Sequence, residues 1–349
     1  MKIKMQRLSL VSLFFFFGWA LIAAGHAMAA EAQISQDVEY EAGFYYTVQK
    51  GDTLWDLSQR FSDSPWQWPD LWRENKQLPN PHWIYPGERI RLFRKSDQHR
   101  QETPATPAAP RVESAPPADL PPLQVDYMYS SVDRVGFIRK PAVQSVGIIF
   151  KSEDDKKLIS ENDLVYVRHP DNHKTNAFMP GTRFTVYKTR QPNNDRDALR
   201  IYGDQHYFLG VVEIVKSDRE YAIAKVMKSF NAISVGDLLM PYEARQPTIP
   251  VVDSTPGIKG QIIASEEQTR IMGDRFIAFI DKGTDDRILP GQVYTIQQEH
   301  SARTGGRSIV LEPVAIGSLL VLRTEKNTST VIITDSRRAI EPGQPISTP

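Results

Sequence analysis

The sequence predicts a multi-domain protein, in which a small βααβ domain is followed by a β-rich C-terminal region of two related barrel or sandwich units. Three observations predict this fold class. The length of 349 residues is enough for two or three domains with a packed core. Residues 44–93 alternate between strand and helix periodicity. The sequence after residue 125 repeats its own pattern at a spacing of about 110 residues.

Composition excludes several classes of function. The 42 Lys and Arg residues balance 42 Asp and Glu residues without a basic block, so the charge distribution is not that of a nucleic-acid binder. The absence of cysteine excludes disulfides, thiolate zinc sites, iron–sulfur clusters, cysteine nucleophiles and a lipoprotein anchor. We therefore expect no nucleic-acid partner, no cofactor and no metal.

Residues 1–29 have the pattern of a secretory signal peptide. Three basic residues precede an apolar run from Leu8 to Ala24, and Ala27-Met28-Ala29 forms an A-x-A cleavage site. The pattern predicts cleavage before Ala30. An uncleaved membrane anchor is the alternative, because the apolar run approaches the length of a bilayer span. No later run is long and apolar enough, which predicts no membrane span in the mature chain.

A strand and a helix open the predicted βααβ domain at residues 44–93. Tyr45-Tyr46-Thr47-Val48 is rich in strand formers and leads into a polar turn that contains Gly51. A helix is predicted next, because apolar or small side chains recur at i, i+3, i+4 and i+7 from Leu54. Thr53 with Asp56 has the form of a capping box at the start of this helix.

A second helix and a closing strand complete the domain. Pro69 is expected in the first turn of the second helix, and the prolines from Pro79 to Pro86 indicate a loop. Ile90 and Leu92 alternate with arginines, which is typical of a strand with one face on the core. The predicted order is therefore strand, helix, helix, strand.

Two motifs in this domain resemble the LysM module. The first is Gly51-Asp52-Thr53-Leu54, shortly after Val48, and the second is Asn80-Pro81, followed by Ile84 and Pro86-Gly87. LysM modules are βααβ folds that bind N-acetylglucosamine-containing glycans such as peptidoglycan or chitin. The resemblance implies a groove between the first strand–helix turn and the last helix–strand loop. The residues that map to this groove are Gly51, Asp52, Thr53, Leu54, Asn80, Pro81, Trp83 and Ile84.

Several of these positions also have a purely structural interpretation. Asp52 and Thr53 are placed to cap the first helix, and we favour capping over a side-chain contact with ligand. Trp55 and Trp72 on the helices are expected to pack in the core, whereas Trp83 suits packing and ligand contact about equally. Residues 44–93 contain six basic and six acidic side chains, so the domain is not an electrostatic clamp. Nearly uncharged sugar rings need backbone polar groups and apolar surface instead.

Residues 94–125 are predicted to be a proline-rich linker. Seven prolines lie between Gln101 and Pro122, and large apolar residues are few. Proline-rich chains favour extended conformations, so about thirty residues at about 3 Å each are expected to hold the two ends several tens of ångströms apart.

The remaining sequence contains a diverged internal repeat. Gly147 and Ser152-Glu153 match Gly260 and Ser265-Glu266 at an offset of 113 residues. The further matches are Asp163 with Asp274, Pro180-Gly181 with Pro290-Gly291, Gly210 with Gly317, and Gly236 with Gly343. Short β-branched runs between these positions predict strands. We therefore expect a β-rich unit at 126–242, a linker at 243–258 and a second β-rich unit at 259–349.

No catalytic set is recognised, and we predict that the protein is not an enzyme. The zinc motifs His-x-His and His-Glu-x-x-His are absent. Pro170 separates His169 from His173, which predicts a surface loop rather than two ligands on one helix face. The acidic clusters at 153–155 and 266–267 are expected to be solvated turns rather than paired glycosidase carboxylates.

The layout of the mature chain is similar to that of the TsaP family, the secretin-associated LysM proteins of type IV pilus systems. The resemblance implies that the LysM domain binds peptidoglycan glycan strands and that residues 126–349 serve a secretin or another envelope protein. We expect a non-catalytic scaffold in the periplasm, associated with the cell wall, that anchors or aligns an outer-membrane secretin. Two alternatives stay open. One is a LysM-targeted peptidoglycan hydrolase or hydrolase activator with an unrecognised site in 126–349, and the other is a general wall-attached envelope stabiliser.

Overall fold

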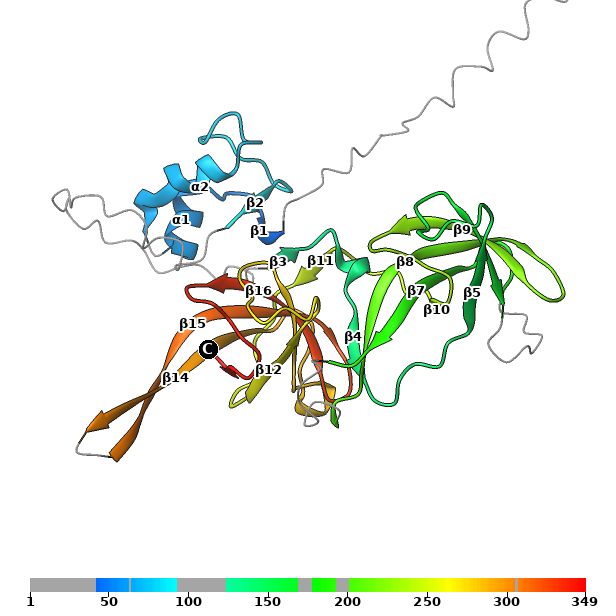
Figure 1. The fold of residues 1–349 in the computed structure, drawn as a ribbon. Coiled ribbons are helices and arrows are strands. Elements are labelled where there is room, and N and C mark those ends of the chain that lie inside the picture. Colours follow the sequence, from blue (N-terminus) through cyan, green and yellow to red (C-terminus); the bar gives the residue numbers. More distant parts are fainter. Residues whose placement is uncertain (1–41, 63, 93–123, 169–177, 193–200, 305–306) are drawn as a thin grey trace, which may run out of the picture. The chain divides into compact units, whose positions relative to one another are not determined.

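The computed structural model describes residues 42–349 except 63, 93–123, 169–177, 193–200 and 305–306 (Figure 1). The predicted signal peptide, His169, His173 and nearly all of the predicted linker lie outside the described residues. A βααβ domain is followed by two β-barrels, which confirms the predicted fold class. None of the helices in the described ranges is long and apolar enough to cross a bilayer.

The N-terminal domain has the predicted order of elements. These are β1 (Gly43–Thr47), α1 (Leu54–Ser62), the 3-10 helix η1 (Pro65–Gln67), α2 (Trp68–Glu74) and β2 (Arg89–Arg91). β1 and β2 are antiparallel, with Tyr46 opposite Ile90. Leu54 and Leu57 of α1 and Leu71 of α2 pack with these two residues in a small buried core. The helical spacing of the leucines therefore does produce one buried face.

The free edge of β1 is covered by strands from distant parts of the chain. β3 (Val125–Met128) pairs with β1, and β11 (Thr248–Pro250) pairs with β3, giving the sheet order β11-β3-β1-β2. Tyr46 lies opposite Ile90 on one side and Val125 on the other. Ile90 of β2 and Val125 of β3, on either side of the undescribed segment 93–123, are thus two strand spacings apart, roughly 10 Å. The two strands lie this close because the N–H and C=O groups on the edge of β1 pair with β3.

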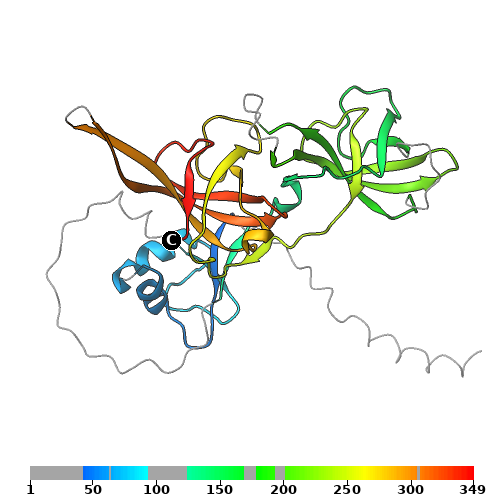
Figure 2. The same ribbon diagram turned by 90° about the horizontal axis from the view of Figure 1, so that it is seen from below.

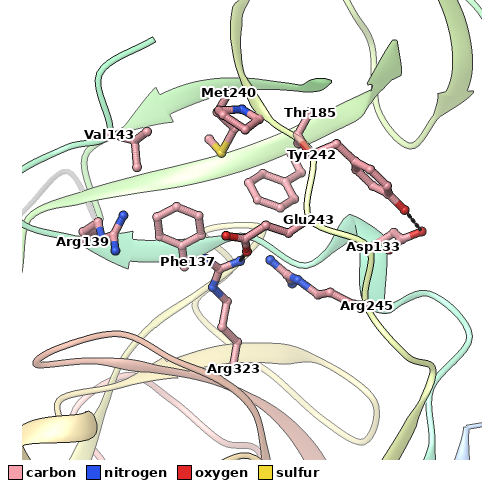
Figure 3. A pocket seen from close by; sticks show the side chains of 12 residues that line it. Asp133, Phe137, Arg139, Val143, Thr185, Met240, Tyr242, Glu243, Arg245 and Arg323 are labelled. Atoms are coloured by element: carbon pink, nitrogen blue, oxygen red, sulfur yellow. Dashed lines mark hydrogen bonds and ion pairs between the residues drawn. The ribbon is translucent and has the colours of Figure 1, made fainter. Parts of the chain in front are cut away.

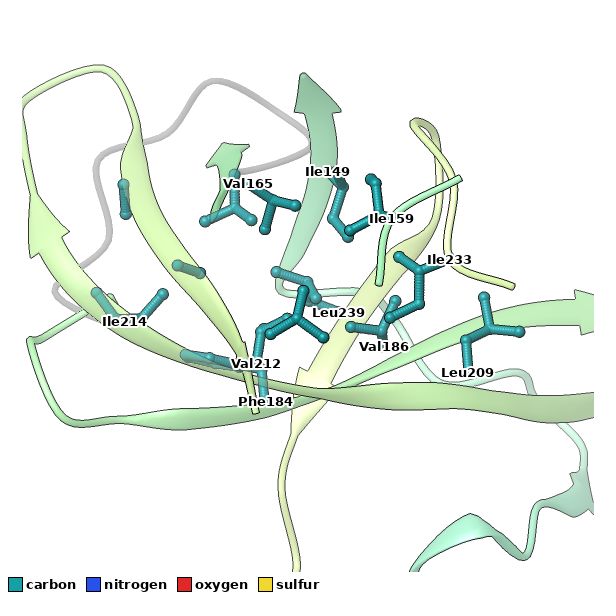
Figure 4. Close-up of a cluster of buried hydrophobic side chains, with 14 of the residues drawn as sticks. Ile149, Ile159, Val165, Phe184, Val186, Leu209, Val212, Ile214, Ile233 and Leu239 are labelled. Atoms are coloured by element: carbon teal, nitrogen blue, oxygen red, sulfur yellow. The ribbon is translucent and has the colours of Figure 1, made fainter. Parts of the chain in front are cut away.

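The first barrel contains strands β4 to β10. These are β4 (Phe137–Arg139), β5 (Gly147–Ser152), β6 (Leu164–Arg168), β7 (Arg183–Arg190), β8 (Asp204–Ser217), β9 (Ala222–Ser229) and β10 (Leu238–Pro241). The order β8-β7-β10-β5-β6-β9 closes because β9 also pairs with β8, and β4 pairs with the N-terminal end of β8. Ile149, Val165, Val212 and Leu239 from four different strands point into the interior (Figure 4).

The second barrel contains strands β12 to β17. These are β12 (Lys259–Ser265), β13 (Ile277–Ile280), β14 (Val293–Thr304), β15 (Arg307–Thr324), β16 (Ser329–Ser336) and β17 (Pro345–Ser347). They close in the order β12-β13-β16-β15-β14-β17. β14 and β15 continue beyond the barrel as a long hairpin, which both ribbon views show (Figure 2). Two 3-10 helices, η3 (Val132–Arg134) and η5 (Thr284–Asp286), lie in connections.

The two barrels are repeats of one another, strand for strand. β5 to β10 have the same neighbours in the first barrel as β12 to β17 have in the second. Gly181 and Gly291 have φ values of +84° and +89°, and their N–H groups donate to Ile214 and Val321 at 2.8 Å in each case. Matched glycines in the sequence therefore mark matched backbone conformations that disfavour other residues.

One match of the predicted repeat is displaced by two residues. Asp163 accepts a backbone hydrogen bond from Val226, and the equivalent bond runs from Ile333 to Phe276. The structural partner of Asp163 is therefore Phe276 and not Asp274, because the strand hydrogen bonds and not the shared side chain fix the register.

β11 lies within residues 243–258, which the sequence predicts to be a linker. Ile249 is buried and packs with Tyr127 of β3 and with Leu320 and Ile332 of the second barrel. This segment thus connects the four-stranded sheet to the second barrel through an apolar contact as well as through strand pairing.

Candidate functional site

The loop between β1 and α1 is organised around Asp52. Gly51 precedes it with a φ of +100°, a conformation that glycine adopts without strain. Asp52 accepts hydrogen bonds from the Tyr46 hydroxyl and the Gln49 N–H, both at 2.7 Å, and lies 3.5 Å from Arg60. Burial and the hydrogen bond to Asp52 raise the pKa of Tyr46 to about 12. Asp52 therefore ties β1 to α1, and the expectation that it caps the helix is wrong.

Thr53 is the residue that caps α1. Its Oγ1 accepts the Asp56 N–H at 3.1 Å and donates to the Asp56 carboxylate at 2.7 Å. This satisfies one of the free N–H groups at the start of the helix. Leu54 is 2 % exposed and packs in the core, so only its backbone is available to a ligand.

Thr53→Ala is expected to destabilise the N-terminal domain by about 1 kcal/mol, because the cap is lost. Thr53→Ser keeps the hydroxyl and is expected to change stability far less. Thermal unfolding followed by tryptophan fluorescence measures both, since Trp55, Trp66, Trp68, Trp72 and Trp83 all lie in this domain. Equal melting temperatures for wild type and Thr53→Ala would contradict the cap.

The second loop, between α2 and β2, presents Trp83 to solvent. Asn80 forms a turn in which its Oδ1 accepts the His82 N–H at 2.9 Å and its carbonyl oxygen accepts the Trp83 N–H at 3.2 Å. Pro81 lies inside this turn and is half-buried. Trp83 is 66 % exposed, whereas Ile84 packs against the core of the domain. The turn therefore holds an indole ring outward on an anchored backbone.

The two loops meet at the same end of the β1–β2 pair. The Val48 N–H donates to the Glu88 carbonyl at 2.8 Å, and the Gly87 N–H donates to the Val48 carbonyl at 2.9 Å. These bonds fix the exit of β1 against the entry of β2. The loop carrying Gly51 and the loop carrying Trp83 are thus held by a shared pair of backbone hydrogen bonds.

The helix tryptophans are exposed, contrary to prediction. Trp55 is 41 % exposed and lies edge-on to Trp66, with 4.8 Å between ring centroids. Trp72 is 36 % exposed, and its indole N–H donates to the Leu78 carbonyl at 2.9 Å. Helix geometry explains the exposure of Trp55. It directly follows the buried Leu54, and successive residues are rotated by about 100° around the helix axis.

Sequence reasoning missed Tyr85, which is 58 % exposed in the second loop. Its N–H donates to the Glu88 carboxylate at 2.8 Å, which fixes its backbone. Exposure alternates along Trp83, Ile84 and Tyr85, with the isoleucine turned inward. The aromatic, aliphatic, aromatic pattern of these three residues was the signal that could have identified Tyr85.

The exposed groups of the two loops suit a neutral, ring-shaped ligand. Indole and phenol rings offer apolar faces with a polar tip, and the turns offer backbone N–H and C=O groups. The part of the chain that the structure describes has no cluster of three or more His, Asp or Glu side chains that could hold a metal ion.

Comparison with known families agrees with this geometry. Residues 46–93 match the family model of the LysM domain. This segment is a LysM domain. LysM domains bind peptidoglycan and related polymers of N-acetylglucosamine, so the chain carries a carbohydrate-binding module.

Two curated relatives share a short segment with this protein. The uncharacterized protein YqbP of Bacillus subtilis (strain 168) is 39 % identical over 57 residues, which cover 14 % of this chain and 26 % of that protein. The spore coat assembly protein ExsA of Bacillus cereus is 36 % identical over 66 residues, which cover 19 % of this chain and 10 % of that protein. The chain thus spans about a quarter and a tenth of the lengths of these relatives.

Proposed function

We propose that this protein is a non-catalytic peptidoglycan-binding scaffold of the cell envelope. The LysM domain holds a glycan strand, and residues 126–349 hold a protein. The observation that carries this proposal is the sheet β11-β3-β1-β2, in which strands of the LysM domain and strands from the barrel region share backbone hydrogen bonds. A glycan on the LysM domain is therefore coupled to the barrel region through a sheet and not only through a linker.

In this proposal the glycan lies across the two loops of the LysM domain. The turn Gly51-Asp52-Thr53-Leu54 contributes backbone polar groups for the acetamido substituents. Trp83 contributes an apolar ring face for a pyranose, and its backbone is fixed by the turn Asn80-Pro81 and by the packing of the next residue, Ile84, against the core. The LysM resemblance and the outward indole ring support this assignment.

Trp83→Ala is expected to weaken the binding of chitin oligomers about tenfold, because the stacking surface for a sugar ring is lost. Tryptophan fluorescence reports the titration, and co-sedimentation with purified cell-wall sacculi gives an independent readout. Trp66→Ala is the matched control, since Trp66 is 71 % exposed against 66 % for Trp83 but lies in η1, outside the two loops.

Two results would contradict the proposed site. If Trp66→Ala weakened binding as much as Trp83→Ala, the glycan would not be positioned by the second loop. If the wild type neither responded to chitin oligomers or muropeptide chains nor sedimented with sacculi, the scaffold proposal itself would have to be abandoned.

For the protein partner we propose the outer-membrane secretin of a type IV pilus-type machine, reached after export to the periplasm by the signal peptide at 1–29. The similarity of layout to the TsaP family supports this choice. Cross-linking in cells followed by affinity capture should recover a secretin. Recovery of wall fragments with no envelope complex would instead favour a general wall-attached stabiliser.

The absence of catalysis is part of the proposal and has its own test. Glu266 is 3 % exposed, so a glycan strand cannot reach its carboxyl group in this fold. Glu153, at the equivalent position of the repeat, is exposed in a turn. We expect no clearing of a peptidoglycan zymogram by the purified protein. Clearing that is lost on Glu153→Gln would establish the hydrolase alternative.

A further inference from the structure

A cavity of about 190 Å³ lies beside β4 and the segment that follows β10 (Figure 3). Phe137 and Phe208 form an apolar part of its wall, and both are buried. Arg323 enters the wall from β15 of the second barrel. None of its lining residues belongs to the LysM domain, so this site is separate from the glycan loops.

Three guanidinium groups, those of Arg139, Arg245 and Arg323, line the cavity. The Cζ atom of Arg323 is 4.3 Å from the ring centroid of Phe137, and that of Arg245 is 5.6 Å from the ring centroid of Phe208. Each guanidinium has five N–H donors in a planar fork that suits a carboxylate. The cavity thus combines aromatic walls with planar cations.

The charge around this cavity is positive. Four cations and three carboxylates line the wall or form ion pairs with residues that do. Their net charge is +1, and it becomes +2 if the Glu243 side chain moves out of the cavity. The cations are Arg139, Arg245, Arg323 and Lys228, and the carboxylates are Asp133, Glu243 and Glu325. Glu325 is buried and shared by Arg139 at 2.9 Å and Arg323 at 3.0 Å. An additional carboxylate is therefore electrostatically favoured once Glu243 leaves.

Glu243 shows which chemical group the cavity accepts. Its carboxylate lies 3.7 Å from Arg323, and its side chain is 72 % exposed (Figure 3). The residue sits on a segment without regular structure after β10. An exposed ion pair of this length contributes less than about 1 kcal/mol, so a ligand carboxylate can replace it.

Asp133 is held by contacts within the protein. Its Oδ2 accepts from Lys228 at 3.0 Å and from the Tyr242 hydroxyl at 3.2 Å. Its Oδ1 is buried and has no hydrogen-bond partner within the described part of the chain. This oxygen is closed to solvent, so a ligand in the cavity does not reach it. Recognition therefore falls to the guanidinium groups, whose planar fork suits a carboxylate such as that of a peptide C-terminus.

We propose that this cavity binds the C-terminal carboxylate of a peptide in exchange for the side chain of Glu243. The ligand carboxylate contacts Arg323 and Arg245 in the place that the Glu243 carboxylate leaves. The carboxylate can come from the tail of a protein or from a stem peptide of the cell wall. The proposal does not depend on glycan binding.

Isothermal titration calorimetry of the purified protein with N-acetyl-alanyl-alanine tests this proposal. We expect saturable binding, at least tenfold tighter than for the C-terminal amide of the same dipeptide. The L,L and D,D forms distinguish the two sources, because protein tails end in L-residues and wall stem peptides in D-residues. Trp83→Ala should leave this binding unchanged, which separates it from failure of the glycan site.

Variants sharpen the test. Glu243→Gln is expected to increase dipeptide affinity severalfold, because the competing carboxylate is removed. Glu220 is an exposed glutamate on the β8–β9 turn, so Glu220→Gln is the matched control and is expected to have no effect. Arg323→Gln is expected to reduce affinity at least tenfold in a variant whose circular dichroism is unchanged. Three results would each overturn the proposal. The acid and the amide could bind with equal affinity, inorganic phosphate could bind more tightly than the dipeptide, or neither wild type nor Glu243→Gln could reach saturation at millimolar dipeptide.

Discussion

Gly291→Ala is expected to destabilise the second barrel by about 4 kcal/mol and to lower its melting temperature by about 10 °C. The φ of +89° at this position costs an alanine about 1–2 kcal/mol. A Cβ atom there would also overlap the carbonyl oxygen of Pro250 on β11. The Gly291 carbonyl accepts the Val252 N–H at 3.2 Å, so the segment after β11 is fixed against this turn and cannot move away freely.

The repeat supplies a matched control for this variant. Gly181 occupies the equivalent turn of the first barrel with a φ of +84°, but nothing lies within 4 Å of a Cβ built there. Gly181→Ala is therefore expected to cost only the conformational term, about 1–2 kcal/mol. Thermal unfolding followed by far-UV circular dichroism compares the two, and equal shifts would contradict the contact with β11.

The same variant tests the coupling between the barrel region and the LysM domain. Displacement of Pro250 disturbs β11, whose strand partner β3 is itself paired with β1. We expect the tryptophan fluorescence transition, which reports the LysM domain, to shift to lower temperature in Gly291→Ala and to stay unchanged in Gly181→Ala. An unchanged fluorescence transition in both variants would mean that the four-stranded sheet does not transmit stability.

The elements of the LysM domain could be predicted because their signals are local. The Thr53 cap, the helical spacing from Leu54 and the alternation around Ile90 each depend on a few neighbouring residues. The exposure of Trp55 was predicted wrongly because residue type outweighed helix geometry. An indole suggests a core, but its position one residue after Leu54 places it on the outer face.

Nonlocal pairing explains what sequence reasoning could not supply. β3 and β11 have four and three residues, too few for a periodic pattern, and β1 pairs with β3 across the predicted linker. The arginines of the cavity face the same difficulty, because Arg139 and Arg323 meet only after both barrels have formed. The glycines of the repeat could be matched, because positive φ restricts Gly181 and Gly291 to one residue type.

The contact between the barrels is expected to weaken as pH rises from about 5 to 8, because of Glu266. This side chain is 3 % exposed, and its Oε1 accepts the Gly136 N–H at 2.7 Å. Burial raises the pKa of Glu266 from 4.5 to about 7, and the neighbouring Glu267 adds to the increase. The charges of Arg134 and Arg190 oppose it.

The sign of the effect follows from proton binding. Between pH 4.5 and 7 the folded protein keeps a proton on Glu266 that the unfolded chain has released. Stability from this group is therefore greatest below pH 4.5, falls as pH rises towards 7 and is constant above it. A pKa difference of about 2.5 corresponds to about 3 kcal/mol of unfolding free energy at pH 8.

Glu266→Gln removes this titration while keeping an oxygen that can accept the Gly136 N–H. We expect the variant to be more stable than wild type at pH 8, with the difference vanishing near pH 4.5. The difference between the two proteins is the quantity to measure, because burial lowers the pKa of His206 to about 4 and destabilises both proteins as pH falls below 6.5.

Glu153→Gln is the control, because Glu153 occupies the equivalent position of the first barrel. Glu153 donates its backbone N–H to Leu164 as Glu266 donates to Ile277, but its side chain is exposed. We expect its variant to follow the wild-type profile at every pH. Chemical denaturation at pH 5 and pH 8 measures both variants. A Glu266→Gln protein that is less stable than wild type at pH 8 would show that the ionised carboxylate stabilises the contact between the barrels.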